Sequence, residues 1–216
     1  QLKKEKIMLT EWSYFYFKRA ISPENCEKII NFAITKRKEE FARTGSLNNV
    51  KKLTKKKKQQ ILKIRNSNVV WMSEPWIYDL IDPFVTRANK NAGWNFEFNY
   101  HEPSQFTIYR KGQYYDWHQD SYSKPYENKD NINLNGKTRK LSMTLQLSKP
   151  GAYKGGKLEF YVPQIKKPVY KKFICNEIAE QGSICVFPSH VWHRVTPVTQ
   201  GTRYSLVNWT LGAPFK

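Results

Sequence analysis

Apolar residues follow two different patterns along the chain, and the pattern changes near Trp94. Up to that point they recur mainly at helical spacing, which predicts amphipathic helices. Ser22, Pro23 and Glu24 supply an N-cap, a first-turn proline and a first-turn acid, so the first helix is expected to begin there. The predicted elements are a strand at 12–17, a helix from 23 to about 41, a strand region at 61–72 and a helix from 75 to about 91 with Pro83 inside it.

After Trp94 the pattern is typical of short strands separated by turn residues. The predicted strands are 96–100, 105–110, 140–147, 157–161, 169–174, 183–187 and 204–210. Helices followed by short strands predict an α+β fold, a double-stranded β-helix (jelly roll) with the N-terminal helices packed against the major sheet. No internal repeat is visible, so we expect a single domain over 1–216, with helical support at about 1–93 and the jelly-roll core at about 94–212.

Lysine and arginine outnumber acidic residues by 37 to 18, which gives a formal charge of +19. Such a charge favours encounters with anions, whether nucleic acid, acidic proteins or a small dicarboxylate. Much of the lysine lies in the tract 51–58, within the aperiodic polar stretch 43–60, which predicts a long solvated loop. A loop that closes over an acidic substrate, or one that touches nucleic acid, is the alternative.

The cysteines Cys26, Cys175 and Cys185 are far apart and form no CxxC pair. This spacing argues against a zinc site built on paired cysteines, and it favours free thiols in a reducing compartment. No apolar run approaches the roughly 20 residues of a membrane span, and the first residues lack the apolar core of a signal peptide. We therefore expect a cytoplasmic protein (host cytoplasm if virus-encoded), monomeric and without a membrane partner.

His118 and Asp120 place an imidazole and a carboxylate two positions apart. In extended backbone, residues i and i+2 point to the same face, so the two side chains can bind one metal ion from one strand end. A second histidine would complete a two-histidine, one-carboxylate set, which leaves coordination positions free for a bidentate cosubstrate and O₂. By itself this short pattern also fits an ordinary surface pair.

On local grounds either His190 or His193 could be the second histidine, because both follow a predicted buried strand and Pro188. Arg203, ten residues beyond His193 on a following strand, favours His193. A fixed guanidinium near a metal suits one end of a dicarboxylate, since arginine forms bidentate pairs with carboxylates. An exposed salt bridge is the alternative for Arg203.

These residues resemble the signature of the prolyl 4-hydroxylase-like dioxygenases, and the chain is most similar to their PKHD-type group of small microbial and viral members. The resemblance covers roughly 12–212 and is densest over 105–210. Its landmarks, in order, are the segments 109–120, 139–147, 155–160, 187–198 and 201–206.

The resemblance implies iron(II) ligands at His118, Asp120 and His193. It implies that Arg203 binds the distal carboxylate of 2-oxoglutarate and that Tyr109 hydrogen-bonds this cosubstrate; ascorbate is a further expected cofactor. Tyr115 and Arg139 match positions near a bound peptide. By alternation, Thr144 and Gln146 line the same pocket as Ser142, and Trp209 shares the face of Arg203; the alternative for each is packing in the core.

The implied activity is hydroxylation of peptidyl proline, in a peptide or protein that the positive charge predicts to be acidic, coupled to decarboxylation of 2-oxoglutarate to succinate. Two polar segments, 43–60 and 121–138, are expected to close over this peptide. The main rival is an AlkB-like nucleic-acid oxygenase, but that group usually carries a second arginine where this chain has Trp209. Hydroxylation of another residue or of a free amino acid, and a non-catalytic basic binding module, also stay open.

Overall fold

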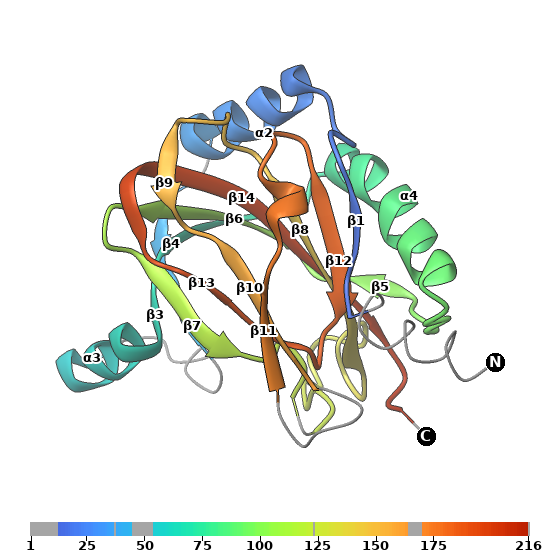
Figure 1. The fold of residues 1–216 in the computed structure, drawn as a ribbon. Coiled ribbons are helices and arrows are strands. Elements are labelled where there is room, and N and C mark those ends of the chain that lie inside the picture. The colour runs from blue at the N-terminus through green and yellow to red at the C-terminus, as the bar shows by residue number, and fades with distance from the viewer. Residues whose placement is uncertain (1–12, 37, 45–53, 123, 164–169, 216) are drawn as a thin grey trace.

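Two antiparallel β-sheets form the body of the protein (Figure 1), for which the computed structural model describes residues 13–36, 38–44, 54–122, 124–163 and 170–215. The larger sheet has the order β1-β12-β8-β14-β6-β4-β2, with β5 and β9 also paired to β14. Its strands are β1 (Phe15–Phe17), β2 (Glu40–Phe41), β4 (Asn68–Met72), β5 (Tyr100–His101), β6 (Ser104–Arg110), β8 (Thr138–Gln146), β9 (Tyr153–Gly155), β12 (Ile184–Pro188) and β14 (Val198–Gly212).

The smaller sheet has the order β11-β10-β13-β7-β3. Its strands are β3 (Arg65–Asn66), β7 (Tyr114–His118), β10 (Leu158–Pro163), β11 (Tyr170–Ile174) and β13 (Trp192–Val195). A core that includes Tyr109, Phe160 and Phe187 fills the space between the two sheets. Two facing antiparallel sheets of this kind form the expected jelly roll.

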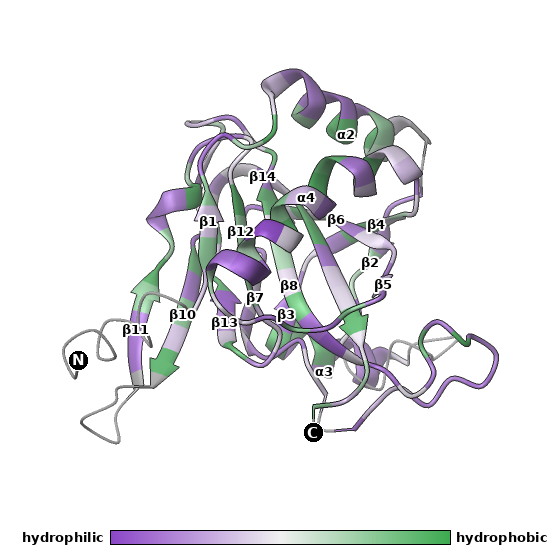
Figure 2. Ribbon diagram, turned by 90° about the vertical axis from the view of Figure 1, so that its right-hand side faces the viewer, coloured by the Kyte–Doolittle hydropathy of each residue, from purple (hydrophilic) through white to green (hydrophobic). Residues whose placement is uncertain are grey.

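Helices α2 (Pro23–Lys36) and α4 (Pro75–Asn91) lie on the outer side of the larger sheet (Figures 1 and 2). Their apolar stripes share one buried cluster with the sheet, in which Ile29 and Ile81 join Phe106. Pro83 does not divide α4, because it lies on the exposed side of the helix. Proline has no N–H to donate to the carbonyl four residues earlier, and on the exposed side of the helix water can donate to that carbonyl instead. No helix of the described residues is long and apolar enough to cross a membrane.

Strand β8 separates the two cores. Leu141, Met143 and Leu145 belong to the cluster beneath the helices, whereas Ser142 bonds to Asp120 on the opposite face. The period-two alternation predicted for this strand is therefore confirmed, and it directs the polar residues of β8 toward the inside of the jelly roll.

Several predicted elements were wrong at their ends or in type. Helix α2 ends at Lys36 instead of near 41, and residues 40–41 form β2 against β4. Of the strand predicted at 96–100, only Tyr100 is in a strand, the two-residue β5 that continues to His101. The short strands β7, β9 and β13 were not predicted. Parts of the predicted strands at 12–17 and 169–174 lie outside the described residues.

The predicted long loop 43–60 and the start of the strand region 61–72 contain helix α3 (Lys55–Ile64) instead. Thr54 caps this helix by accepting a hydrogen bond from the Lys57 backbone N–H at 3.3 Å. Ile61, within the helix, is buried. Lysine and glutamine have good helix propensity, so one cap and one buried anchor suffice despite the repeated charge. Residues 51–53 of the lysine tract lie outside the described residues.

Candidate metal centre

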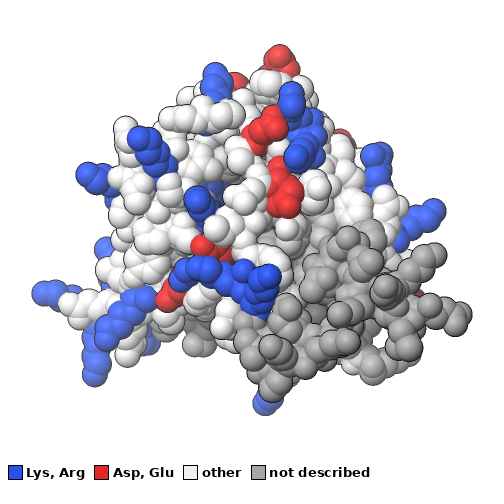
Figure 3. All heavy atoms as spheres, in the orientation of Figure 1, with Lys and Arg blue, Asp and Glu red and all other residues white. Residues whose placement is uncertain are grey.

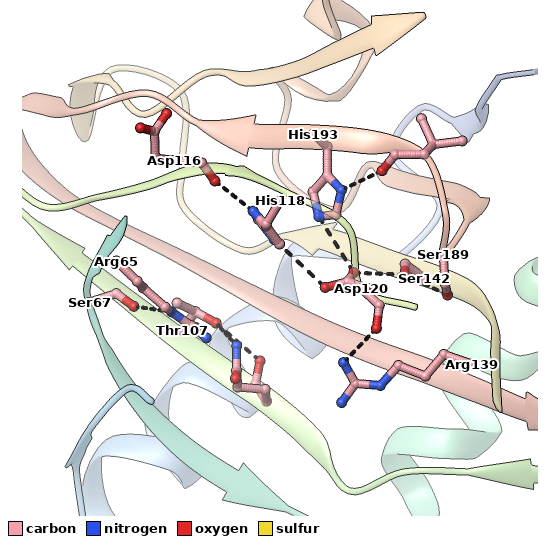
Figure 4. Close-up of polar contacts among 12 residues, drawn as sticks. Arg65, Ser67, Thr107, Asp116, His118, Asp120, Arg139, Ser142, Ser189 and His193 are labelled. Carbon is pink, nitrogen blue, oxygen red and sulfur yellow. Dashed lines mark hydrogen bonds and ion pairs between the residues drawn. The ribbon is translucent and has the colours of Figure 1, made fainter. Parts of the chain in front are cut away.

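His118 and His193 are direct cross-strand neighbours on β7 and β13. Their ring centroids lie 4.1 Å apart, and Asp120 follows two residues after the end of β7 (Figure 4). The Asp120 carboxylate lies 3.7 Å from His118 Nε2 and 3.5 Å from His193 Nε2. Adjacent strands therefore bring His193 next to His118 and Asp120, although more than seventy positions of the sequence separate it from them.

Both imidazoles are oriented by backbone carbonyl groups two residues before them. His118 Nδ1 lies 2.7 Å from the Asp116 carbonyl oxygen, and His193 Nδ1 lies 2.9 Å from that of Val191. A carbonyl oxygen only accepts hydrogen bonds, so each Nδ1 carries the proton. The lone pair of each Nε2 is then free to bind a metal ion, and the hydrogen bond behind it fixes the ring.

The Asp120 segment is held by Ser142 and Ser189. Ser142 Oγ donates to Asp120 Oδ2 at 2.7 Å and lies 2.9 Å from Ser189 Oγ. The Ser189 carbonyl accepts from the backbone N–H groups of Asp120 and Ser121, at 2.9 Å each, and the Ser189 N–H donates to the carbonyl of Lys140 at 2.9 Å. Ser189 thereby ties the loop after β7 to the end of β12.

The electrostatics favour the metal-binding protonation states. Burial raises the pKa of Asp120, but His193, His118 and Arg139 outweigh it and lower that pKa to about 2. Burial, followed by the neighbouring His193, lowers the pKa of His118 well below its usual 6.5. At neutral pH the carboxylate is therefore charged and the His118 imidazole is neutral.

Among the described residues, His118, Asp120 and His193 are the one group of three or more His, Cys, Asp or Glu side chains whose ligand atoms lie within 4.8 Å of one another. His190 does not belong to it, so the structure favours His193 over its rival. Two imidazole nitrogens and a carboxylate match the donor set of non-haem iron(II) sites. The residues present therefore fit an iron(II) ion.

Arg203 and Tyr109 face each other across β14 and β6 and border the cavity beside the metal ligands. Arg203 is 3 % exposed, and its Nη1 lies 3.3 Å from Ser205 Oγ. No carboxylate of the described residues pairs with it. Burial raises the pKa of Tyr109, so its hydroxyl stays protonated and able to donate. A buried guanidinium without an internal counter-ion is suited to an anionic ligand.

The two polar residues predicted from β8 take different positions. Thr144 borders the metal cavity, as expected. Gln146 instead borders a second cavity on the far side of Arg203, where its Nε2 donates to Tyr153 Oη at 2.7 Å. The prediction that Gln146 lines the same pocket as Thr144 was therefore wrong, because two further residues along β8 carry the side chain past the guanidinium.

The three predicted substrate residues surround the metal ligands. The Tyr115 ring stacks on His118, with centroids 3.4 Å apart and planes at 11°. Arg139 makes hydrogen bonds of 2.7 and 2.6 Å to Glu102 and lies 3.9 Å from the centre of the Trp209 ring. Both Arg139 and Trp209 are buried, at 8 % and 5 % exposure. Arg139 Nη1 also lies 3.4 Å from the Asp120 carbonyl oxygen, and a contact of these residues with substrate stays a prediction.

Sequence reasoning missed two charged residues of the site. Glu102 neutralises Arg139, but 37 positions separate the pair. Arg65 on β3 is 4 % exposed, lies 4.5 Å from the centre of the Tyr115 ring and borders the metal cavity. Its Nε donates to Ser67 Oγ at 2.8 Å (Figure 4). Neither residue belongs to a recognisable motif, so only tertiary structure identifies them.

Comparison with known proteins agrees with this site. The family model of the 2OG-Fe(II) oxygenase superfamily matches residues 104–211, which carry all three metal ligands and Arg203. The chain belongs to this superfamily, and the family resemblance predicted from the sequence is confirmed.

Within that class the chain is similar to PKHD-type hydroxylases. It is 34 % identical over 108 residues to one from Teredinibacter turnerae, covering 50 % of this chain and 42 % of the relative. It is 40 % identical over 77 residues to one from Hyphomonas neptunium, covering 34 % of this chain and 29 % of the relative. The matched part thus spans less than half of either relative.

Solved structures share the fold at low identity. The viral collagen prolyl hydroxylase of Paramecium bursaria Chlorella virus-1 superposes with a TM-score of 0.57 at 18 % identity, covering 94 % of this chain and 97 % of that one. The Trichoplax adhaerens prolyl hydroxylase, solved with a peptide fragment of hypoxia inducible factor, gives 0.62 at 16 % identity, covering 96 % and 89 %. These likenesses establish the jelly-roll fold alone.

Proposed function

We propose that this chain is an iron(II)- and 2-oxoglutarate-dependent hydroxylase that acts on proline in a peptide or protein. The observation that carries the proposal is the combination of a His118–Asp120–His193 centre with a buried, uncompensated Arg203 beside it. The bound iron would supply the chemistry that couples decarboxylation of 2-oxoglutarate to succinate with insertion of oxygen into a C–H bond.

The chain's own residues would orient the cosubstrate. Arg203 would pair with its distal carboxylate, and the Tyr109 hydroxyl would donate a second hydrogen bond from the opposite strand. Thr144 offers a further hydroxyl on the same cavity wall. With the distal carboxylate fixed, the 2-oxo acid end would point to the free positions on the metal. Ascorbate would serve as an external reductant that keeps the metal as iron(II).

Two observations support a peptide substrate over a nucleic-acid base. Trp209 occupies the position where AlkB-like proteins usually have a second arginine, and its ring is covered by Arg139. Several structural neighbours are also prolyl hydroxylases. Lysine and arginine outnumber acidic residues on the face in Figure 3, which suits an acidic partner.

A peptide panel tests this proposal. Purified protein would be supplied with iron(II), ascorbate, 2-oxoglutarate and proline peptides in matched acidic and neutral sequence contexts. Mass spectrometry should detect a gain of one oxygen on the peptide, matched by an equal amount of succinate. Succinate formation without any modified proline peptide would retain the oxygenase class and reject the proline assignment.

Three variants test the metal ligands independently of substrate identity. His118→Ala and His193→Ala should abolish iron binding and succinate formation, whereas His190→Ala should retain both. Loss of iron binding in His190→Ala, together with retention in His193→Ala, would contradict the proposed centre.

A further inference from the structure

A second cavity of about 380 Å³ lies behind Arg203, where β14 pairs with β9. Its walls come from the segment around the paired glycines 155–156 and from the turn after β11, which includes Cys175 and Ala179. This volume lies in the range of small-molecule sites in proteins. Arg203 borders both this rear cavity and the metal cavity.

The charge of the rear cavity has one sign. Lys154, Lys157 and Arg203 border it, and no aspartate or glutamate is among the described residues that line it. Glu177 lies in the adjacent 3-10 turn, but it accepts a hydrogen bond from the Tyr14 hydroxyl at 3.4 Å and does not line the cavity. Three cations around one concave space create a positive potential that attracts a multiply charged anion.

Gln146, one of the residues that line the rear cavity, also carries an unpaired buried polar atom. Gln146 is fully buried, and its Oε1 has no hydrogen-bond partner among the described residues, while its Nε2 donates to Tyr153 Oη. Buried polar atoms are generally paired, so an acceptor here calls for a donor from a ligand or water. A hydroxyl group on the anion would supply it.

The paired glycines shape this space. Both have positive φ, +76° at Gly155 and +56° at Gly156, which L side chains rarely adopt. A Cβ on Gly156 would lie 2.9 Å from Arg203 Cδ, and one on Gly155 would lie 2.2 Å from the Pro197 carbonyl oxygen. The backbone thus packs directly on the stem of Arg203, at the boundary between the two cavities.

We propose that the rear cavity is a second binding site, for a small hydroxylated polycarboxylate, distinct from the cosubstrate position beside the metal. Lys154 and Lys157 would hold its outer carboxylate, and Arg203 and Gln146 would receive its inner end. Since one guanidinium would serve two anions, occupancy of the rear site weakens binding of 2-oxoglutarate, and the reverse effect has the same size. This coupling, unlike the binding itself, rests on the proposed function.

L-Malate is a suitable probe, and succinate is the matched anion without the hydroxyl. The protein would first be saturated with Mn(II) and N-oxalylglycine, an inert cosubstrate analogue that fills the metal cavity, and malate would then be titrated by calorimetry. We expect malate to bind the filled protein, and to bind more tightly than succinate. Absence of malate binding, in both the filled and the metal-free protein, would overturn the proposal.

Two variants locate the binding. Lys154→Glu/Lys157→Glu should weaken malate binding by about tenfold or more, because two attractive charge contacts become repulsive. Ala179→Trp should block the cavity from the other wall. Lys171→Glu changes an exposed lysine on β11 outside the lining and should leave the malate affinity unchanged. Equal malate affinity in all four proteins would place the anion elsewhere and reject the rear site.

The coupling is measured separately. Increasing malate should raise the apparent Kd for 2-oxoglutarate by several-fold to a plateau, since two sites are involved, and Ala179→Trp should remove this effect. A rise without a plateau would mean that malate simply competes in the metal cavity. If N-oxalylglycine itself does not bind, the proposed function fails, and malate titration of the metal-free protein still decides whether the rear site exists.

Discussion

The Arg139 guanidinium lies 3.9 Å from the centre of the Trp209 ring while it forms two hydrogen bonds to Glu102. Arg139 Nη1 also lies 3.4 Å from the Asp120 carbonyl oxygen. The cation therefore connects the core of the larger sheet to the segment that carries a metal ligand. Its removal should affect both stability and the metal site.

Arg139→Met should destabilise the protein by about 3–5 kcal/mol, because Glu102 would be left buried without its partner. Urea unfolding measures this loss. The double variant Arg139→Met/Glu102→Leu should be more stable than the single variant, since no unpaired charge remains. If the double variant is no more stable than Arg139→Met, the loss of stability does not come from the unpaired Glu102 carboxylate.

Ser142→Ala should weaken metal binding by about 10- to 100-fold, the usual effect of removing a partner of a metal ligand. The hydroxyl donates to Asp120 Oδ2 and fixes the carboxylate toward the two imidazoles. Calorimetric titration with Mn(II) measures the change. Ser148→Ala removes a similar buried hydroxyl, one that accepts from the Tyr204 N–H, and should leave metal affinity unaltered.

Arg203→Met should raise the KM for 2-oxoglutarate by about 10- to 100-fold, the value of a charge-assisted hydrogen bond, while the affinity for the metal alone is retained. The KM of Arg203→Lys should lie between those of the wild type and Arg203→Met, because lysine keeps the charge but loses the bidentate geometry. An unchanged KM in Arg203→Met would show that the cosubstrate carboxylate binds elsewhere.

Stability of the metal-free protein should decrease as the pH falls below about 6.5, the ordinary pKa of histidine. Burial lowers the pKa of His118 in the folded state, so the unfolded chain binds a proton that the folded chain does not. Each such proton contributes a slope of up to about 1.4 kcal/mol per pH unit. Urea unfolding at pH 7 and pH 5 should show a smaller pH effect in His118→Asn than in the wild type.

Asp120 should also make the metal-free protein less stable as the pH falls, but in a lower pH range. Its pKa is lowered from 3.8 to about 2, so its contribution is present above pH 4 and is lost as the pH falls toward 2. The two contributions can be separated because they occupy different pH ranges. An Asp120→Asn variant whose acid unfolding below pH 4 matched that of the wild type would contradict the lowered pKa.

Thr54→Ala should destabilise helix α3 by about 1 kcal/mol through loss of its N-cap. The Thr54 hydroxyl accepts from the Lys57 N–H. Hydrogen exchange of the amides of α3 would report the change locally. Thr35→Ala, which removes a hydroxyl that bonds within α2, should leave exchange in α3 unaffected.

Local spacing predicted the centre of the site well. His118 and Asp120 converge because they are two positions apart at a strand end, and this needs no knowledge of the rest of the fold. His193 and Arg203 followed from a family pattern whose spacing along the chain is informative. Residues whose position follows from one element or one motif could thus be predicted.

Residues whose position depends on contacts between distant segments could not be predicted from the sequence. Glu102 meets Arg139 only through the packing of two segments 37 positions apart, and Arg65 enters the cavity from β3, at the edge of the smaller sheet. Helix α3 was not predicted because a run of lysines has no apolar periodicity, and Ile61 is the only buried residue among the described residues of the helix. Gln146 had the correct face, but its distance along β8 put it beyond Arg203.

Ser189, directly after β12, accepts two backbone hydrogen bonds from the loop of Asp120, and it bonds to β8 through its own N–H and its hydroxyl. Together with the carbonyl groups that hold both imidazoles, these contacts fix the three ligands before any ion arrives. Metal uptake should therefore resemble occupation of a rigid receptor, with little ordering of the chain. The protein can then lose and regain its iron without unfolding, so its activity would follow the supply of iron(II) reversibly.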